Sequence, residues 1–152
     1  MGNVSVRQSK SRKKAVAAGF RSKLEQRCAQ MMSENNMPYE YEPKDKVLTY
    51  TLPVRSAKCA NCGEKHNIVQ QHSYTTDFYV RGCYVEVKGR FIAKDRKKML
   101  AIKEQHPDKK FVIALQSPKV KITKKTNYAQ WCEKKGFIWV KAPSGIIKYF
   151  KK

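Results

Sequence analysis

The sequence predicts an α/β fold, in which a mixed β-sheet is flanked by helices. The chain has 152 residues, 41% of them hydrophobic, which suits one compact domain with its own core. In its second half, strand-like segments alternate with helix-like ones, and this favours a sheet covered by helices. We therefore expect a folded domain over residues 18–141, between a disordered basic arm at 1–17 and a basic tail at 142–152.

One helix is predicted at the start of the domain, over residues 19–35. Apolar residues recur there at helical spacing, as Phe20, Leu24 and Cys28 show. The helix must end before Pro38, because proline lacks the amide hydrogen and restricts the residue before it.

The elements that follow are separated by turn residues, and the strands among them are rich in aromatic and β-branched side chains. In chain order we expect strands at Tyr39–Glu42 and Val47–Val54, a polar loop at 55–66, strands at Tyr74–Val80 and Cys83–Gly89, a helix at Ala93–Gln105, a strand at Phe111–Gln116, a helix at 126–135 and a strand at Phe137–Lys141. Arg81 and Gly82 form the two-residue turn of the hairpin between the third and fourth strands.

The charge of the chain indicates a polyanionic partner. It holds 33 Lys and Arg against 12 Asp and Glu, a formal net charge of +21, and such an excess suits a phosphate backbone that is contacted at many points. The alternative is a merely soluble cationic surface. No apolar run is long enough for a membrane span, and no secretory signal opens the chain. We therefore expect a soluble intracellular protein without a membrane partner.

The hairpin brings charged residues to one face. If the two turn residues are the whole connection, Asp77 falls directly opposite Glu86, with Cβ atoms about 5 Å apart. Because side chains alternate along a strand, Lys88 joins the same face. The opposite face receives an apolar set: Phe78, Val80, Val85 and Val87. The register thus predicts one charged face and one hydrophobic face.

Asp77 and Glu86 would repel each other unless a cation lay between them. Carboxylate oxygens suit Mg²⁺ or Mn²⁺, and a lysine beside the metal can orient the attacking water and stabilise charge on a phosphate. The alternative is an exposed strand whose acids face solvent, because a change of one residue in the turn would destroy the register. The scarcity of acids in this chain favours the metal site.

The same residues resemble a known nuclease motif. Thr76-Asp77, followed after eight residues by Glu86-Val87-Lys88, is similar to the PD-(D/E)xK signature. The segments that extend the resemblance include Gly19-Phe20-Arg21-Ser22-Lys23-Leu24-Glu25, Tyr39-Glu40-Tyr41-Glu42, His72-Ser73-Tyr74-Thr75, Asp95-Arg96-Lys97-Lys98 and Trp131-Cys132-Glu133-Lys134-Lys135-Gly136. From about residue 17 to 140, the chain resembles endonuclease I of podophages, a family of Holliday-junction resolvases.

This resemblance implies a restriction-endonuclease-like fold in an intertwined, domain-swapped homodimer that cuts four-way and branched DNA with magnesium. It implies that Asp77, Glu86 and Glu25 hold the metal, that Val87 adds its backbone carbonyl, and that Lys88 is the catalytic lysine. Glu40 falls at a further acidic position. A phage-encoded member would act in the cytoplasm of the host cell.

The chain departs from the family pattern at Thr76, in a gap between Asp77 and Glu86 that is one residue shorter, at residues 55–71 and beyond about residue 140. Thr76 stands where the family usually has proline, and we expect this to be tolerated because proline supplies rigidity rather than chemistry. Residues 55–71 look like an insertion, and they carry Cys59-Ala60-Asn61-Cys62-Gly63, which has the form of a zinc knuckle.

The knuckle supplies only two of the four ligands that tetrahedral zinc needs. His66 and His72 are candidates for the others, although His72 belongs to the family-like segment. Alternatively, two knuckles could meet across a dimer, or the segment could be a flexible loop with two free thiols. Cys28, Cys83 and Cys132 are interpreted as small core residues.

Aromatic residues are interpreted as core or sheet packing rather than base-stacking platforms. This interpretation covers Trp131, Trp139, Tyr39, Tyr41, Tyr50 and Tyr74. Basic residues near the predicted site and in the arm are expected to contact phosphate: Arg12, Lys13, Lys14, Arg21, Lys23, Arg90, Arg96, Lys97 and Lys98. The rival hypothesis is a non-catalytic, basic zinc-knuckle protein that binds nucleic acid.

Overall fold

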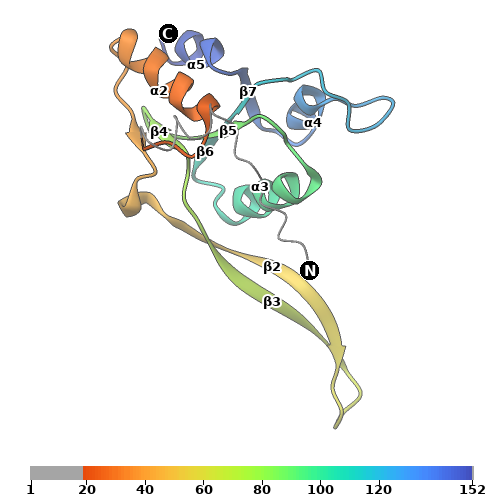
Figure 1. Cartoon of the computed structure of the whole chain (residues 1–152). Helices are drawn as coiled ribbons and strands as arrows, with labels where there is room; N and C mark the ends of the chain where they lie inside the picture. The colour runs from red at the N-terminus through yellow and green to blue at the C-terminus, as the bar shows by residue number, and fades with distance from the viewer. Residues whose placement is uncertain (1–18, 152) are drawn as a thin grey trace, which may run out of the picture.

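The computed structural model describes residues 19–151 and has the predicted α/β architecture. A five-stranded sheet has the order β1-β4-β5-β6-β7 (Figure 1). Its β1–β4 and β4–β5 pairs are antiparallel, and its β5–β6 and β6–β7 pairs are parallel, so the sheet is mixed as expected. The arm predicted at residues 1–17 lies outside the described residues.

The elements run in chain order through both sheets of the molecule. They are α2 (Lys23–Glu34), β1 (Glu40–Tyr41), the 3-10 helix η1 (Lys44–Lys46), β2 (Leu48–Lys58), β3 (Lys65–Tyr74), β4 (Phe78–Val80), β5 (Cys83–Lys88), α3 (Ala93–Gln105), β6 (Lys110–Leu115), α4 (Tyr128–Lys134), β7 (Ile138–Lys141) and α5 (Ser144–Phe150).

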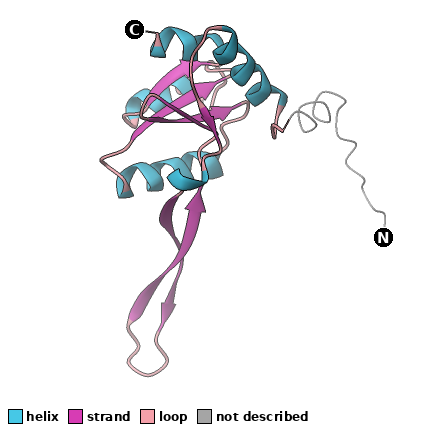
Figure 2. Cartoon of the chain, turned by 90° about the vertical axis from the view of Figure 1, so that its left-hand side faces the viewer, coloured by secondary structure: helices cyan, strands magenta, loops and turns pink. Residues whose placement is uncertain are grey.

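Helices cover both faces of the central sheet (Figure 2). Helices α2 and α5 share one core cluster with Val85 and Val87 of β5. Helices α3 and α4 share a second cluster with Tyr84 of β5 and with Ile113 and Leu115 of β6. Because β5 and β6 are covered on both faces, their sequences are almost continuously hydrophobic, as is usual for buried parallel strands.

Only residues 59–64 of the polar loop predicted at 55–66 are a loop, because the residues on either side belong to strands. Strands β2 and β3 form a long antiparallel hairpin from the pair Leu48↔Tyr74 to the pair Lys58↔Lys65, and this hairpin projects from the domain (Figure 2). Its outer part is exposed on both faces. It therefore lacks the alternation of apolar and polar residues by which a half-buried strand is recognised.

The tail predicted at residues 142–152 contains a helix that belongs to the core. Ile146, Ile147 and Phe150 of α5 are buried and join the cluster formed with α2. The lysines around these residues suggested a solvated extension, but the apolar positions fall on one face of a short helix. Among the described residues, no helix has the length and apolar character needed to cross a membrane.

Candidate active site

The β4–β5 hairpin has the register that the sequence predicts. Val80 pairs with Cys83 and Phe78 pairs with Val85. Both turn residues have positive φ, as a type I′ turn requires, with 46° at Arg81 and 82° at the following glycine.

Asp77 lies just before β4 and is tied to the facing strand. The backbone N–H of Val87 donates a 2.8 Å hydrogen bond to Asp77 Oδ2. The apolar face of the hairpin enters the first core cluster as predicted, through Phe78, Val80, Val85 and Val87. The charged face is not open to solvent, because Glu86 is only 4% exposed.

Glu86 is held by two side chains in this interior. The hydroxyl of Tyr74 donates to its Oε2 at 2.8 Å, and Lys88 Nζ lies 3.1 Å from its Oε1. Asp95, in the first turn of α3, has its Oδ1 3.6 Å from Lys88 Nζ. Burial lowers the pKa of Lys88, but the neighbouring Glu86 and Asp95 more than offset this and raise it above the ordinary value, so the ammonium stays charged.

Asp77 is a carboxyl group that resists ionisation. Burial, reinforced by the charge of Glu86, raises the pKa of Asp77 to about 8. The N–H of Val87 opposes this shift because it favours the carboxylate, Glu25 adds to the shift, and Lys88 lowers it. The influence of both acids on Asp77 indicates that Glu25, Asp77 and Glu86 belong to one electrostatic group.

Glu25 reaches this group from helix α2. Ser22 caps the helix and accepts a hydrogen bond from the N–H of Glu25 at 3.1 Å. The hydroxyl of Tyr41 donates to Glu25 Oε2 at 2.7 Å, and the N–H of Arg21 donates to the same oxygen at 3.3 Å. Glu25 is 7% exposed, so the cap and β1 together hold a buried carboxylate at the start of the helix.

Thr76 is fixed by hydrogen bonds to the hairpin. Its buried hydroxyl is placed to donate to the carbonyl oxygens of Phe78 and Val85, each at 3.0 Å. These contacts link the segment before Asp77 to both strands of the hairpin.

Tyr41 and Tyr74 contact the candidate site carboxylates, which the sequence interpretation missed. Both pack in a core as predicted, but their hydroxyl groups also bind the site carboxylates. Nothing in the sequence distinguishes a packed tyrosine from one that bonds a carboxylate across the fold. Asp95 was missed for the same reason, since only the folded chain brings α3 to Lys88.

Among the described residues, Glu40 pairs with a lysine instead of contacting the buried carboxylates. Its Oε2 lies 2.8 Å from Lys46 Nζ at the edge of the sheet.

The basic residues predicted to contact DNA are in different environments. Lys23, Arg90 and Lys97 are exposed. Arg21 is also exposed at 74%, but it pairs with Glu42 at 2.6 Å.

Two of these basic side chains cover aromatic rings. Arg96 lies over Trp131 at 6.0 Å, and Lys98 lies over Tyr74 at 5.2 Å. Lys98 therefore covers the tyrosine that binds Glu86. Arg12, Lys13 and Lys14 lie outside the described residues.

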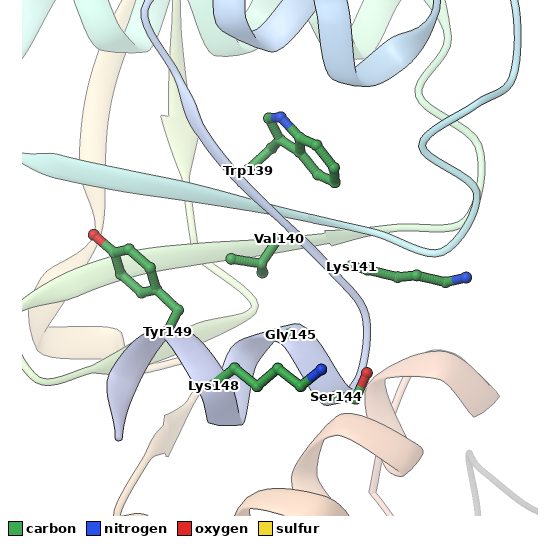
Figure 3. A pocket seen from close by; sticks show the side chains of 7 residues that line it. All are labelled: Trp139, Val140, Lys141, Ser144, Gly145, Lys148 and Tyr149. Carbon is green, nitrogen blue, oxygen red and sulfur yellow. The ribbon is translucent and has the colours of Figure 1, made fainter. Parts of the chain in front are cut away.

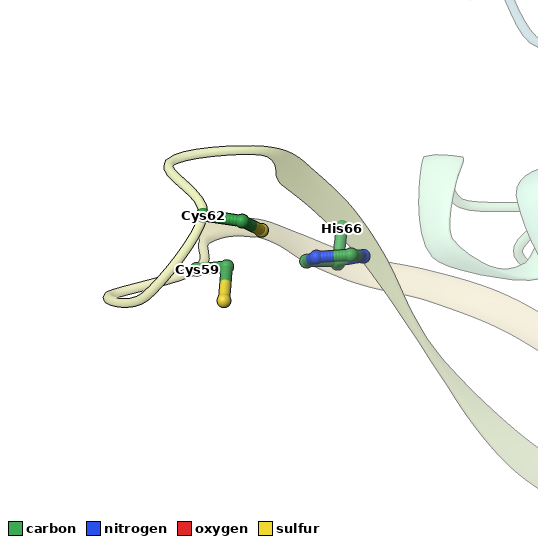
Figure 4. A group of neighbouring side chains, drawn as sticks. All are labelled: Cys59, Cys62 and His66. Atoms are coloured by element: carbon green, nitrogen blue, oxygen red, sulfur yellow. The ribbon is translucent and has the colours of Figure 1, made fainter.

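The predicted zinc residues are only partly brought together. Cys59, Cys62 and His66 have donor atoms within 4.8 Å of one another at the tip of the β2–β3 hairpin (Figure 4). His72 does not join them, because its ring stacks on Tyr50 with centroids 5.3 Å apart. Backbone N–H groups donate to the sulfur of Cys59 and lower the pKa of its thiol.

A surface pocket lies on different elements from the carboxylates. It is lined by residues of β7 and α5, among them Trp139, Lys141, Lys148 and Tyr149 (Figure 3). It contains none of the acids described above, so the buried carboxylate group remains the candidate catalytic centre.

Comparison with known proteins points to one family. Residues 64–145 match the model of phage endonuclease I. Endonuclease I of Escherichia phage T7 is 32% identical over 142 residues, which cover 86% of this chain and 84% of that protein. Endodeoxyribonuclease 1 of Enterobacteria phage T3 is 31% identical over 123 residues, which cover 79% of this chain and 70% of that protein. The chain belongs to the phage endonuclease I family.

Proposed function

We propose that this protein is a metal-dependent DNA endonuclease that resolves four-way and other branched DNA junctions by hydrolysing phosphodiester bonds. The observation that carries the proposal is the buried Glu86, which is held between the Tyr74 hydroxyl and the Lys88 ammonium beside Asp77. A structural strand would gain nothing from burying this charged group, because burial of charge is costly. The relatives named as endonucleases support the same conclusion.

The residues present fit a divalent cation. Asp77, Glu86 and Glu25 supply carboxylate oxygens, which Mg²⁺ and Mn²⁺ prefer. Burial and mutual repulsion disfavour ionisation of Asp77, and a cation would relieve that repulsion. In our proposal the ion is held by Asp77, Glu86 and the backbone carbonyl of Val87. Glu25 is a further carboxylate of the metal site. When bound, the ion polarises the phosphate and lowers the pKa of a coordinated water.

Lys88 and the tyrosines position the reacting groups. The charged ammonium of Lys88, held by Glu86 and Asp95, orients the attacking water and stabilises negative charge on the phosphate. Tyr74 and Tyr41 fix the carboxylates that they bind, so that the oxygens do not reorient when DNA arrives. The N–H of Val87 does the same for Asp77.

The basic surface supplies the affinity for DNA. The chain carries a formal net charge of +21, and we assign phosphate contacts to the exposed Lys23, Arg90 and Lys97 and to the arm that contains Arg12, Lys13 and Lys14. Contacts of this kind read the shape of a junction rather than its bases. We also propose an intertwined homodimer, which would place two sites on one junction. Its support is the family and the apolar Val54 and Val69, which are exposed on the projecting hairpin.

The test is cleavage of a labelled four-way junction and a linear duplex of matched sequence, with Mg²⁺ and with EDTA. We expect paired nicks in the junction, dependent on the metal, and loss of cleavage in Glu86→Gln with DNA binding retained. Glu40→Gln is the matched control, because it removes an acid that is paired only at the sheet edge. It should cut normally.

Tight binding without cleavage under any divalent ion would overturn the proposal and favour the non-catalytic nucleic-acid-binding protein. Equal cleavage of junction and duplex would remove the junction preference while leaving the endonuclease. Sedimentation of the same sample tests the dimer, which is contradicted if the active species is a monomer.

A further inference from the structure

The tip of the β2–β3 hairpin gathers three metal-binding side chains at a distance from both cores. Cys59 and Cys62 lie in the turn, and His66 follows at the start of β3. Figure 1 shows the hairpin reaching away from the domain, with the turn at its far end. The three donor atoms lie within 4.8 Å of one another, although neither core cluster of the described residues includes them.

We propose that Cys59, Cys62 and His66 bind one zinc ion in each chain, with the fourth tetrahedral position taken by water. Thiolate and imidazole donors suit Zn²⁺ rather than Mg²⁺. Zinc bonds of about 2.3 Å to sulfur and 2.0–2.1 Å to nitrogen imply donor separations of about 3.5–3.8 Å around a tetrahedron. The observed limit of 4.8 Å between donor atoms is longer than this, so the three side chains would rotate to close around an ion.

The backbone of the turn is already arranged for such an ion. The N–H of Gly63 donates to the carbonyl of Cys59 at 2.9 Å, and the N–H of Cys59 donates to the carbonyl of Glu64 at 2.7 Å. The N–H groups of Asn61 and Cys62 donate to the sulfur of Cys59. Such hydrogen bonds orient a ligand.

Gly63 allows the turn to close. Its φ of 73° lies in the left-handed region, which is open to glycine at little cost. The chain can therefore reverse directly after Cys62, and it returns so that His66 pairs with Ala57, two residues before Cys59. This reversal is what places an imidazole from the returning strand beside both sulfurs.

His66, and not His72, is the third ligand. Along β3 the two histidines are six residues apart, and His72 stacks on Tyr50 near the domain. Among the described residues the cluster contains only the three donors. A fourth position is therefore open to solvent, as in zinc sites that keep an exchangeable ligand.

The ion would give the tip the stability that packing does not supply. An isolated two-stranded hairpin is marginally stable in water, and the outer residues of β2 and β3 are exposed on both faces. A metal bond between the turn and β3 joins the two strands where no core does. This role is independent of the carboxylate site, which lies in the folded domain.

The experiment uses the full chain, purified under reducing conditions without chelator. The zinc content is measured, the metal is removed, and Co²⁺ is added as a spectroscopic probe. We expect one thiolate-bound metal ion per chain, visible absorption typical of tetrahedral Co²⁺, and near-ultraviolet bands from cobalt–thiolate bonds. Cys59→Ser and His66→Gln should each weaken binding by about a hundredfold or more, because even loss of an outer partner of a ligand costs 10- to 100-fold.

His72→Gln is the matched control, since it changes a histidine of the same strand outside the cluster. It should bind metal as the unchanged chain does. Hydrogen exchange over residues 58–66 should slow when zinc is added to the unchanged chain and to His72→Gln, but not to His66→Gln. Because the tip is remote from the cores, the circular dichroism of all variants should remain that of the folded protein.

Three results would overturn the proposal. The first is the absence of stoichiometric metal and of a cobalt–thiolate spectrum while both thiols are reduced. The second is a spectrum that His66→Gln leaves unchanged. The third is half an ion per chain, which would mean a site shared between two tips. The Glu86→Gln variant should still bind zinc at the hairpin tip. Loss of nuclease activity can therefore be distinguished from loss of the zinc site.

Discussion

The hydroxyl of Tyr74 donates a hydrogen bond to Glu86 Oε2 at 2.8 Å, and both residues are almost fully buried. The two come from different sheets, because Tyr74 ends β3 of the projecting hairpin and Glu86 lies in β5 of the central sheet. Burial and the neighbouring Glu86 raise the pKa of Tyr74 well above its ordinary value, so the hydroxyl remains a donor. The hairpin is thereby joined to the candidate active site.

Replacing Tyr74 with Phe should slow cleavage without unfolding the protein. Hydrogen bonds to charged groups contribute about 1.5–3 kcal/mol, so we expect the rate of junction cleavage to fall about 10- to 100-fold. The ring that packs near Phe111 is retained. Single-turnover kinetics at saturating metal measure the effect. Tyr84→Phe is the control, because that ring packs near Phe111 as well but makes no hydrogen bond to Glu86 in the described residues; an equal loss in both variants would contradict the prediction.

Thr76→Val should destabilise the hairpin that carries Asp77. The change leaves the shape of the side chain but removes the hydroxyl that lies 3.0 Å from the carbonyls of Phe78 and Val85. Loss of a buried partner costs about 1–3 kcal/mol, which denaturant unfolding would measure. Thr76→Ser keeps the hydroxyl and should recover most of this difference. If Thr76→Ser and Thr76→Val lower the free energy of unfolding equally, the hydroxyl contributes no more than the methyl group, and the prediction is contradicted.

The stability of the metal-free protein should fall as pH rises through the titration of Asp77. Burial and Glu86 raise the pKa of Asp77 from 3.8 to about 8. Folding therefore favours the protonated form of Asp77. The stability that this group contributes is fully present below the pKa of Asp77 in the unfolded chain, and it is lost as pH rises through the pKa of Asp77 in the folded protein. Unfolding in EDTA at about pH 6 and about pH 9 measures the slope.

Asp77→Asn should flatten this pH dependence, because the amide does not titrate. Asp45→Asn is its control, since the Asp45 side chain is 75% exposed. A slope that survives in Asp77→Asn would assign the titration to another group. Divalent metal should stabilise the unchanged protein most at high pH, where it does not have to displace the proton.

The five cysteines should divide into two reactivity classes. Cys59 and Cys62 are accessible at the hairpin tip, whereas Cys83 is buried and burial raises the pKa of Cys28 and of Cys132 to about 12. Since the thiolate is the nucleophile, an alkylating reagent at neutral pH should label only the first two in the native, metal-free protein. Mass spectrometry of peptides locates the labels. Denatured protein is the control, and native labelling of Cys132 as fast as Cys59 would refute the classes.

Ile146→Ala should destabilise the whole domain, although it lies in a segment that resembles a solvated tail. Ile146 is fully buried in the cluster that α5 shares with α2. Truncation of a buried isoleucine costs about 2–5 kcal/mol, which thermal or denaturant unfolding would detect. Lys148→Ala changes an exposed residue of the same helix and should leave stability within about 0.5 kcal/mol. Similar effects of the two changes would show that α5 is not part of the core.

Local patterns in the sequence determined the hairpin and its register. A two-residue turn at Arg81 and Gly82, followed by alternating side chains, is sufficient to pair Phe78 with Val85 and to send the apolar face into a core. The α/β class followed from the order of strands and helices for the same reason. These features depend on neighbours along the chain, and periodicity records such neighbours directly.

Only the tertiary structure decided which groups surround the carboxylates. Tyr41 reaches Glu25 across 16 residues and Tyr74 reaches Glu86 across 12, and no local pattern encodes those contacts. The outer hairpin and α5 were misread for a related reason. The outer hairpin is exposed on both faces and shows no alternation of apolar and polar residues. Helix α5 has three buried residues in a segment that is rich in lysine. Burial depends on what the rest of the fold places against a segment, and a single segment does not carry that information.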